Sequence, residues 1–174
     1  MEKSMRLGIA ALVVGVLAAV GLSMVVLYYA HPAEATFPGK NGRIAYVSLT
    51  QNREADIYTV NPDGIGKFRV TNTKNTTEQS PDYSPNGKKI AYAGWNRNYV
   101  SHIYIISATG GKPFQVTNTR FGEGGPIYSP NGKKIAYMDN RQEYPGGGLH
   151  TISLRGGGKS RVTEGADPSW GSCP

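Results

Sequence analysis

The sequence predicts an all-β fold that consists of about three repeated units, each with four antiparallel strands. The segment Tyr83–Tyr92 recurs residue for residue at Tyr128–Tyr137, 45 positions further along the chain. After Thr36 no segment shows the apolar period of a helix, and Pro or Gly interrupts each stretch of about ten residues. Self-similarity at a period of roughly 20–50 residues is the signature of a repeat architecture.

The first 35 residues are predicted to direct the chain to a membrane. An uncharged apolar run of 24 residues, Leu7–Ala30, follows a basic N-terminal flank. As a helix this run would span roughly 36 Å, enough to cross a bilayer. The Ala-Glu-Ala sequence at 33–35 matches a signal-peptide cleavage site. An N-terminal transmembrane helix and a cleaved signal peptide both stay open, and both predict that 36–174 is exported to the periplasmic or extracellular side.

Three repeats divide the exported region into units at about 37–80, 81–125 and 126–171. A looser copy of the repeated segment lies at Gly39–Tyr46, and a Val-Thr pair recurs every 46 residues from Val70 onward. Four short strands in about 45 residues are typical of a β-propeller blade. A β-sandwich with accidental self-similarity is the alternative.

Turn signals separate the predicted strands of each blade. Pro-Asn-Gly, at 85–87 and again at 130–132, presets φ with its proline and tolerates positive φ at the two residues that follow. We expect the Ile-Ala-Tyr triplet of each blade to be central and largely buried. The expected strands are Arg43–Val47, Asp56–Val60, Phe68–Thr71, Lys89–Ala93, His102–Ser107, Phe114–Thr117, Lys134–Met138, His150–Leu154 and Arg161–Thr163.

The repeat resembles that of TolB-like, WD-type β-propeller proteins. The resemblance is carried by Pro81–Tyr92, followed by Ile103-Tyr104 and Val116-Thr117, and Pro168–Gly171 looks like the start of a further copy. It implies that the Pro-Asp-Tyr-Ser segment is the innermost strand of a blade and that the other strands follow outward. It covers residues 37–171. Three repeats look truncated beside TolB, which combines a six-bladed propeller with an α/β domain.

The resemblance also implies a class of function. Propellers of this family usually bind partners in the cell envelope, and related propellers are the front domains of serine peptidases. We therefore expect a non-enzymatic module that binds an envelope protein or glycan. Two alternatives stay open: a truncated propeller fragment without independent activity, and a regulatory front domain related to propeller-containing serine peptidases.

The alternating strand direction predicts two unlike faces. The turn face carries the connections from first to second strands, at 84–88 and 129–133, and those from third to fourth strands. It collects nearly all of the net charge of +7. Lysines in repeated turns can simply be solubilising, edge-protecting residues. The functional alternative is attraction to an anionic surface through Lys88, Lys89, Lys133 and Lys134.

The loop face, which carries the connections from second to third strands and the links between blades, holds the candidate partner-binding residues. Aromatic and arginine side chains on loops over a rigid scaffold are typical anchors of a partner. Ordinary long polar loops are the alternative. The candidates are Arg53, Trp95, Arg97, Tyr99, Arg141 and Tyr144.

The sequence contains no signature of catalysis or cofactor binding. Gly156–Ser160 resembles the end of a phosphate-binding loop, but Ser153 stands where that loop needs its first glycine. No G-x-S-x-G motif occurs, and the histidines lack the clustered spacing of a metal site. The lone Cys173 excludes a disulfide framework. We expect no enzyme activity, no cofactor, no metal and no nucleic-acid partner.

The strands at which the first and last repeats begin predict a homodimer. The first blade begins at its second strand, whereas Asp167–Gly171 supplies a spare first strand. Three blades are too few for a closed ring, because propellers typically have about 4–8 blades. Exchange of the spare strand between two chains would complete a six-bladed ring, with Trp170 packed in the first blade of the partner.

Overall fold

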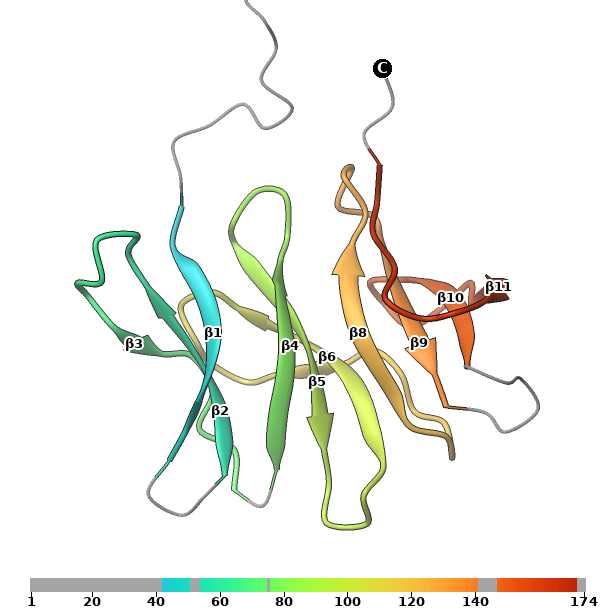
Figure 1. Ribbon diagram of the computed structural model, residues 1–174, viewed down its shortest axis with the longest axis horizontal. Coiled ribbons are helices and arrows are strands. Elements are labelled where there is room, and N and C mark those ends of the chain that lie inside the picture. The colour runs from blue at the N-terminus through green and yellow to red at the C-terminus, as the bar shows by residue number, and fades with distance from the viewer. Residues whose placement is uncertain (1–41, 51–53, 75, 141–146, 172–174) are drawn as a thin grey trace, which may run out of the picture. The chain divides into compact units, whose positions relative to one another are not determined.

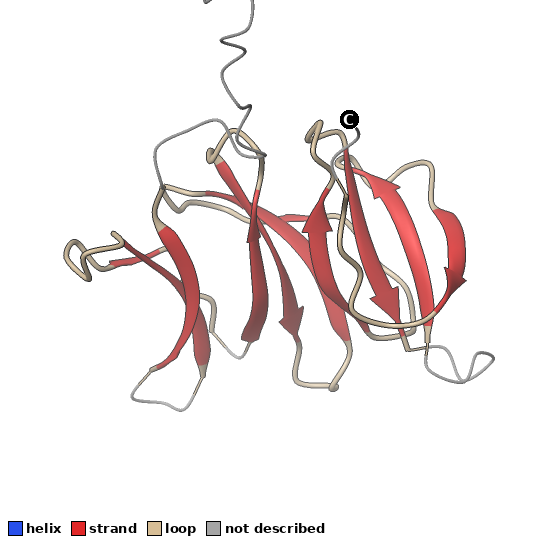
Figure 2. Ribbon diagram, turned by 45° about the horizontal axis from the view of Figure 1, so that its top comes forward, coloured by secondary structure: helices blue, strands red, loops and turns tan. Residues whose placement is uncertain are grey.

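The computed structural model describes residues 42–50, 54–74, 76–140 and 147–171. Strands joined by loops and turns make up these residues, and no helix occurs among them (Figure 1, Figure 2). The all-β prediction is therefore confirmed. The predicted signal peptide or anchor, 1–35, lies outside the described residues. Within them, no helix of the length and apolarity needed to span a membrane is found.

The strands form three antiparallel sheets, each of which corresponds to one predicted blade (Figure 1). In the second and third sheets the four strands lie side by side in chain order, as the family resemblance implied. The first sheet has three strands within the described residues. The strands are β1 (Ile44–Leu49), β2 (Ala55–Val60) and β3 (Phe68–Arg69); β4 (Thr77–Tyr83), β5 (Lys89–Trp95), β6 (Ser101–Ser107) and β7 (Phe114–Gln115); β8 (Glu123–Tyr128), β9 (Lys134–Asp139), β10 (Gly148–Ser153) and β11 (Ser160–Glu164).

The predicted strands agree with the observed ones to within two residues at either end, and the fourth strands of the first two blades end two residues early. β3 ends at Arg69, two residues before the expected Thr71. The amides of Val70 and Thr71 both donate to the Ile57 carbonyl, at 2.9 and 3.3 Å, so the regular ladder stops there. The Thr71 hydroxyl then accepts the Ile57 amide at 2.8 Å. A threonine side chain thus replaces a backbone partner at the end of the strand.

The Pro-Asn-Gly turns owe their repeated sequence to a shared hydrogen-bond pattern. The Asn86 side-chain oxygen accepts the Lys88 amide at 3.1 Å, and the Ser84 hydroxyl accepts the Lys89 amide at 2.9 Å. Gly87 has a φ of 67°, which glycine adopts without steric cost. The same contacts recur at 129–134. Figure 1 shows both turns at one end of the sheets, opposite the 96–100 loop.

The core lies between the blades in two layers. Ile57 and Val70 of the first blade pack with Ile90, Tyr92 and Ile106 of the second. A second layer joins the facing flanks of the second and third blades, from Ala91, Ala93, Ile103, Ile105, Val116, Tyr128, Ile135, Tyr137 and Ile152. Each fully buried isoleucine contributes about 1.5–3 kcal/mol of burial free energy.

The expected burial of the Ile-Ala-Tyr triplets is confirmed in two blades and wrong in the first. Ile90 and Ile135 are 0% exposed, whereas Ile44 at the same repeat position is 52% exposed. Isoleucine in the second strand points toward the preceding blade, as the packing of Ile90 against the first blade shows. Among the described residues no sheet covers that side of the first blade.

Candidate binding surface on the loop face

The loop 96–100 holds an exposed tyrosine in a fixed position. The Asn96 side-chain oxygen accepts the amides of Asn98 and Val100, at 2.9 and 3.2 Å. The Tyr99 amide donates to the Asn96 carbonyl at 3.1 Å. Tyr99 has a φ of 57° and is 86% exposed. The left-handed conformation costs a non-glycine residue roughly 1–2 kcal/mol, so Tyr99 combines an unfavourable backbone conformation with an exposed side chain.

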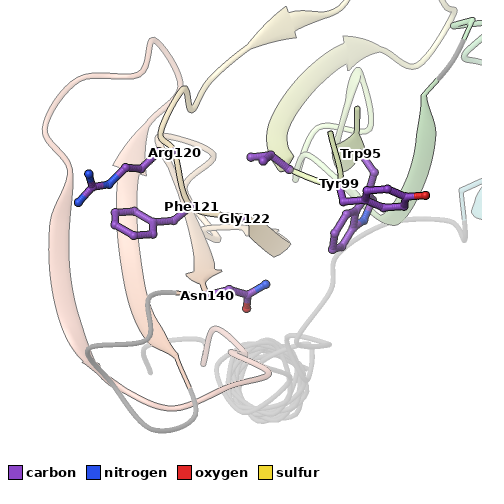
Figure 3. A pocket seen from close by; sticks show the side chains of 7 residues that line it. Trp95, Tyr99, Arg120, Phe121, Gly122 and Asn140 are labelled. Atoms are coloured by element: carbon purple, nitrogen blue, oxygen red, sulfur yellow. The ribbon is translucent and has the colours of Figure 1, made fainter. Parts of the chain in front are cut away.

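Beside Tyr99 lies an open pocket of about 530 Å³ between the second and third blades. Trp95, Tyr99 and Val100 form the side that belongs to the second blade. The other side comes from the link into β8 and from the end of β9. Figure 3 shows Trp95 and Tyr99 across the pocket from Arg120 and Phe121. The residues on this second side are Arg120, Phe121, Gly122 and Asn140.

Short contacts fix the second side of the pocket. The Phe121 amide donates to the Thr119 hydroxyl at 3.1 Å, and the Asn140 amide donates to the Gly122 carbonyl at 2.8 Å. The Arg120 guanidinium lies over the Phe121 ring, 4.9 Å from its centroid. A cation over an aromatic face is stabilised by about 0.5–1 kcal/mol at an exposed site. The pocket therefore combines a positioned positive charge with aromatic surface.

Buried polar clusters join the blades beneath the loop face. The His102 Nδ1 lies 2.9 Å from the Glu123 carboxylate, which also accepts the Thr117 hydroxyl at 3.0 Å. The Thr117 hydroxyl in turn accepts the Ile103 amide at 2.8 Å. His102 and Thr117 belong to the second blade and Glu123 to the third, so these bonds connect the two sheets. Glu123 directly follows Gly122, which lines the pocket.

The equivalent cluster between the first and second blades contains two carboxyl groups. Glu78 is fully buried and accepts the hydroxyls of Thr71, at 3.2 Å, and Thr73. Asp56, where the second blade has His102, pairs with Arg69. Burial is the main cause that raises the pKa of Glu78 to about 8, and the Asp56 carboxyl adds to it. Glu78 therefore carries a proton at neutral pH.

A third cluster lies inside the third blade. The Asp139 carboxylate is 2.9 Å from the His150 Nε2 and 3.5 Å from the Lys159 Nζ. The His150 ring stacks on Tyr137 with 5.7 Å between centroids. Across the described part of the chain, no group of three or more His, Cys, Asp or Glu residues is arranged to hold a metal ion. These contacts hold the strands of the blade together.

The structure brings together two of the six predicted partner-binding residues, Trp95 and Tyr99. Arg97 is exposed in the same loop but does not line the pocket. Arg53, Arg141 and Tyr144 lie outside the described residues. The four predicted anionic-surface lysines are exposed at the opposite end of the sheets. Lys88 and Lys133 lie in the turns, and Lys89 and Lys134 are the first residues of β5 and β9.

Sequence reasoning missed the second side of the pocket, namely Arg120, Phe121 and Asn140. Arg120-Phe121 follows the Val-Thr pair of the second blade, and its mixed aromatic and basic character was an available signal. The glutamates at 78 and 123 were also detectable, because each stands three residues before the proline of a first strand.

Comparison with known structures shows the fold. A chain described as a TolB of Agrobacterium tumefaciens is 22% identical with a TM-score of 0.59. The match covers 68% of this chain and 44% of that TolB chain. TolB of Acinetobacter baumannii is 22% identical with a TM-score of 0.58, and the match covers 70% of this chain and 29% of that TolB chain. A puromycin-hydrolyzing peptidase of Mycobacterium tuberculosis is 12% identical with a TM-score of 0.56, and the match covers 76% of this chain and 21% of the peptidase.

This chain thus spans less than half the length of those TolB chains. None of the curated proteins matches it. The family profile of the TolB beta propeller domain matches residues 34–171, which is most of the chain. The strand order and repeat of the described blades agree with this match. The chain belongs to the TolB β-propeller domain family.

Proposed function

We propose that this chain is a non-enzymatic propeller module that binds a protein or glycan partner of the cell envelope through its loop face. Its family supports a propeller scaffold, and the apolar run Leu7–Ala30 supports export. The observation that carries the proposal is Tyr99, a strained and almost fully exposed aromatic side chain at the mouth of a pocket.

The composition of the pocket favours a ligand with apolar surface next to a hydrogen-bond acceptor. Trp95, Tyr99 and Phe121 offer aromatic surface, while the Arg120 guanidinium and the Asn140 amide offer donors. Aromatic and arginine side chains are the residues that most often dominate binding energy at interfaces. Side chains held in place before binding lose little conformational entropy when the partner arrives.

The proposal includes a role for the opposite, turn face. Exposed lysines at the ends of two identical turns support contact with an anionic surface; they are Lys88, Lys89, Lys133 and Lys134. Each lysine close to an anionic membrane contributes on the order of 1 kcal/mol. Contact of the turn face with the membrane would leave the loop face directed toward a partner in the envelope.

The test is capture of envelope components by the full-length chain in mild detergent. We compare the wild type with Tyr99→Ala and, as the matched control, Ile65→Ala. Ile65 is 69% exposed in the turn between β2 and β3, away from the pocket. We expect a partner that wild type and Ile65→Ala retain and Tyr99→Ala loses, because the variant removes the exposed anchor.

Competition with purified envelope glycan fragments then separates a glycan ligand from a protein ligand. Equal retention by wild type and Tyr99→Ala would show that the loop face is not the binding site. If no variant retained any component, the chain would be a propeller fragment without independent binding.

A further inference from the structure

The first blade exposes an apolar flank, whereas the equivalent flanks of the second and third blades are buried. Ile44, Ile90 and Ile135 occupy the same position in successive second strands, and Ile44 alone among them is accessible. Ile90 packs against the first blade and Ile135 against the second. By its repeat position, Ile44 faces the side on which a preceding blade would lie.

The third blade exposes the complementary flank. Val70, Val116 and Val162 occupy one position in successive fourth strands. Val70 and Val116 are 5% exposed and pack against the following blade, whereas Val162 is 58% exposed. The two outer flanks are thus the two halves of the interface that already joins the blades within the chain.

The segment that follows β11 shares one backbone feature with the first strands of the second and third blades. Ser80 and Gly125 have φ values of 53° and 57°, and each lies at a register shift in the pairing of a first strand with a second strand. Asp167 has the same conformation, with a φ of 51°. Each of the three residues precedes a proline.

This segment also lies where the first strand of a next blade belongs. The Trp170 Nε1 donates to the Ile127 carbonyl of β8 at 3.4 Å. The corresponding contact between the second and third blades joins their first strands, since the Tyr128 amide donates to the Asp82 carboxylate at 2.6 Å. Residues 165–171 pair with no strand, and β1 is the edge of its sheet within the described residues.

We propose that the three-blade unit binds a second copy of this chain head to tail, and that Asp167–Trp170 of each chain pairs with β1 of the other as its first strand. A second copy fits because the described residues of each chain carry both complementary flanks, and within them both β1 and the 165–171 segment lack a strand partner on one side. The described blades of two copies number six, within the range of about 4–8 that closes a propeller.

The repeats set the register of this pairing. Asp82 lies opposite Ala91 and Tyr83 opposite Ile90 in the second blade. The third blade has the same arrangement at its equivalent positions. Ser169 should therefore lie opposite Ala45 of the partner subunit, and Trp170 opposite Ile44 of the partner subunit. Burial of Ile44 and Val162 at two such junctions drives the association.

The test is a disulfide between two differently tagged full-length chains, one with Ala45→Cys and the other with Ser169→Cys, both in a Cys173→Ser background. Opposed residues in an antiparallel pair have Cα atoms about 4.5–5.5 Å apart, within the reach of a disulfide. We expect a covalent heterodimer on a non-reducing gel. Replacing Ala45→Cys with Tyr46→Cys should abolish it, because that side chain points to the opposite face of the strand.

Sedimentation in detergent gives an independent reading. We expect the protein mass of the sedimenting species to be twice the 18.7 kDa of one chain. Ile44→Asp, at a position that is 52% exposed in the single chain, should convert the dimer to a folded monomer. A monomeric wild type, a larger head-to-tail polymer, equal cross-linking through Tyr46→Cys, or a dimer that survives Ile44→Asp would each overturn the proposal.

Discussion

Each of the two blade junctions buries one glutamate, and the two glutamates have different partners. Glu78 and Glu123 occupy one repeat position and are both fully buried. Glu123 faces His102, but Glu78 faces the second carboxyl group of Asp56. Two carboxyl groups in one buried site cannot both ionise at low cost. The first junction therefore keeps a proton on Glu78, with its pKa at about 8.

The raised pKa of Glu78 predicts that stability falls as the pH rises. The native state holds the proton up to about pH 8, whereas an unfolded chain releases it near the ordinary value of 4.5. The native chain thus binds more protons in this window, and its free energy of unfolding decreases with pH across it. Below the window, both states are protonated and the penalty vanishes.

Glu78→Gln should flatten this dependence, because an amide cannot ionise. Its oxygen can accept one of the two threonine hydroxyls, and its NH2 group can donate to the other. The measurement is chemical denaturation of the full-length chain at about pH 5 and about pH 8.5. We expect the variant to gain stability over the wild type at the higher pH. Glu164→Gln, at an exposed position, is the control and should leave the difference unchanged. Parallel pH profiles for wild type and Glu78→Gln would contradict the assignment.

At the scale of elements, the turns between third and fourth strands fix the spacing of the blades. A Cβ atom at Gly110 would lie 3.3 Å from the Val70 carbonyl oxygen, and one at Gly156 2.8 Å from the Val116 carbonyl oxygen. Both glycines have positive φ, 84° and 83°. In the second and third blades this turn thus lies against the backbone of the preceding blade, and a side chain at either glycine would crowd that carbonyl group.

Gly156→Ala should lower the free energy of unfolding by more than about 1 kcal/mol, because alanine is strained at this φ and meets the Val116 carbonyl. The adjacent Gly157→Ala is the matched control. Its Cβ would lie 3.7 Å from the Ser153 hydroxyl, an ordinary contact, so we expect a change within about 0.5 kcal/mol. Thermal unfolding of both full-length variants makes the comparison. Equal midpoints would show that the turn does not set the spacing.

For the whole molecule, the blades separate two kinds of surface. The turn face carries paired lysines from two identical turns, and the loop face carries the aromatic pocket. Strand direction alone causes this division, since connections between antiparallel strands alternate between the two ends of a sheet. A charged residue in the repeated turn therefore recurs on the same face in each repeat.

The charged turn face predicts contact with anionic lipid. We expect Lys88 and Lys133 to react more slowly with an amine label when the full-length chain is in anionic proteoliposomes than in neutral ones. Lys74, in the link between the first and second blades on the loop face, is the internal control. High salt should restore the reactivity, because charges are screened beyond about 8 Å at physiological ionic strength. Equal labelling in both lipids would argue against membrane contact.

Much of the fold, and two of the seven residues that line the described pocket, could be predicted from the sequence. Trp95 and Tyr99 were identifiable as loop aromatics, because one hairpin contains both. Arg120, Phe121 and Asn140 were not, since they reach the pocket from a different blade. Their position depends on how two sheets pack side by side, and no local pattern encodes this packing.

The sequence by itself determined the repeat, the strands, the turns and the separation of the two faces, because each depends on residues a few positions apart. Only the tertiary structure decided which copies of a repeated residue are buried. Ile44 and Ile90 stand in the same Ile-Ala-Tyr triplet, yet one is half exposed and the other has no exposed surface. The physical reason is that burial depends on the neighbouring blade, and Ile90 has the first blade beside it, whereas the described residues place no blade beside Ile44.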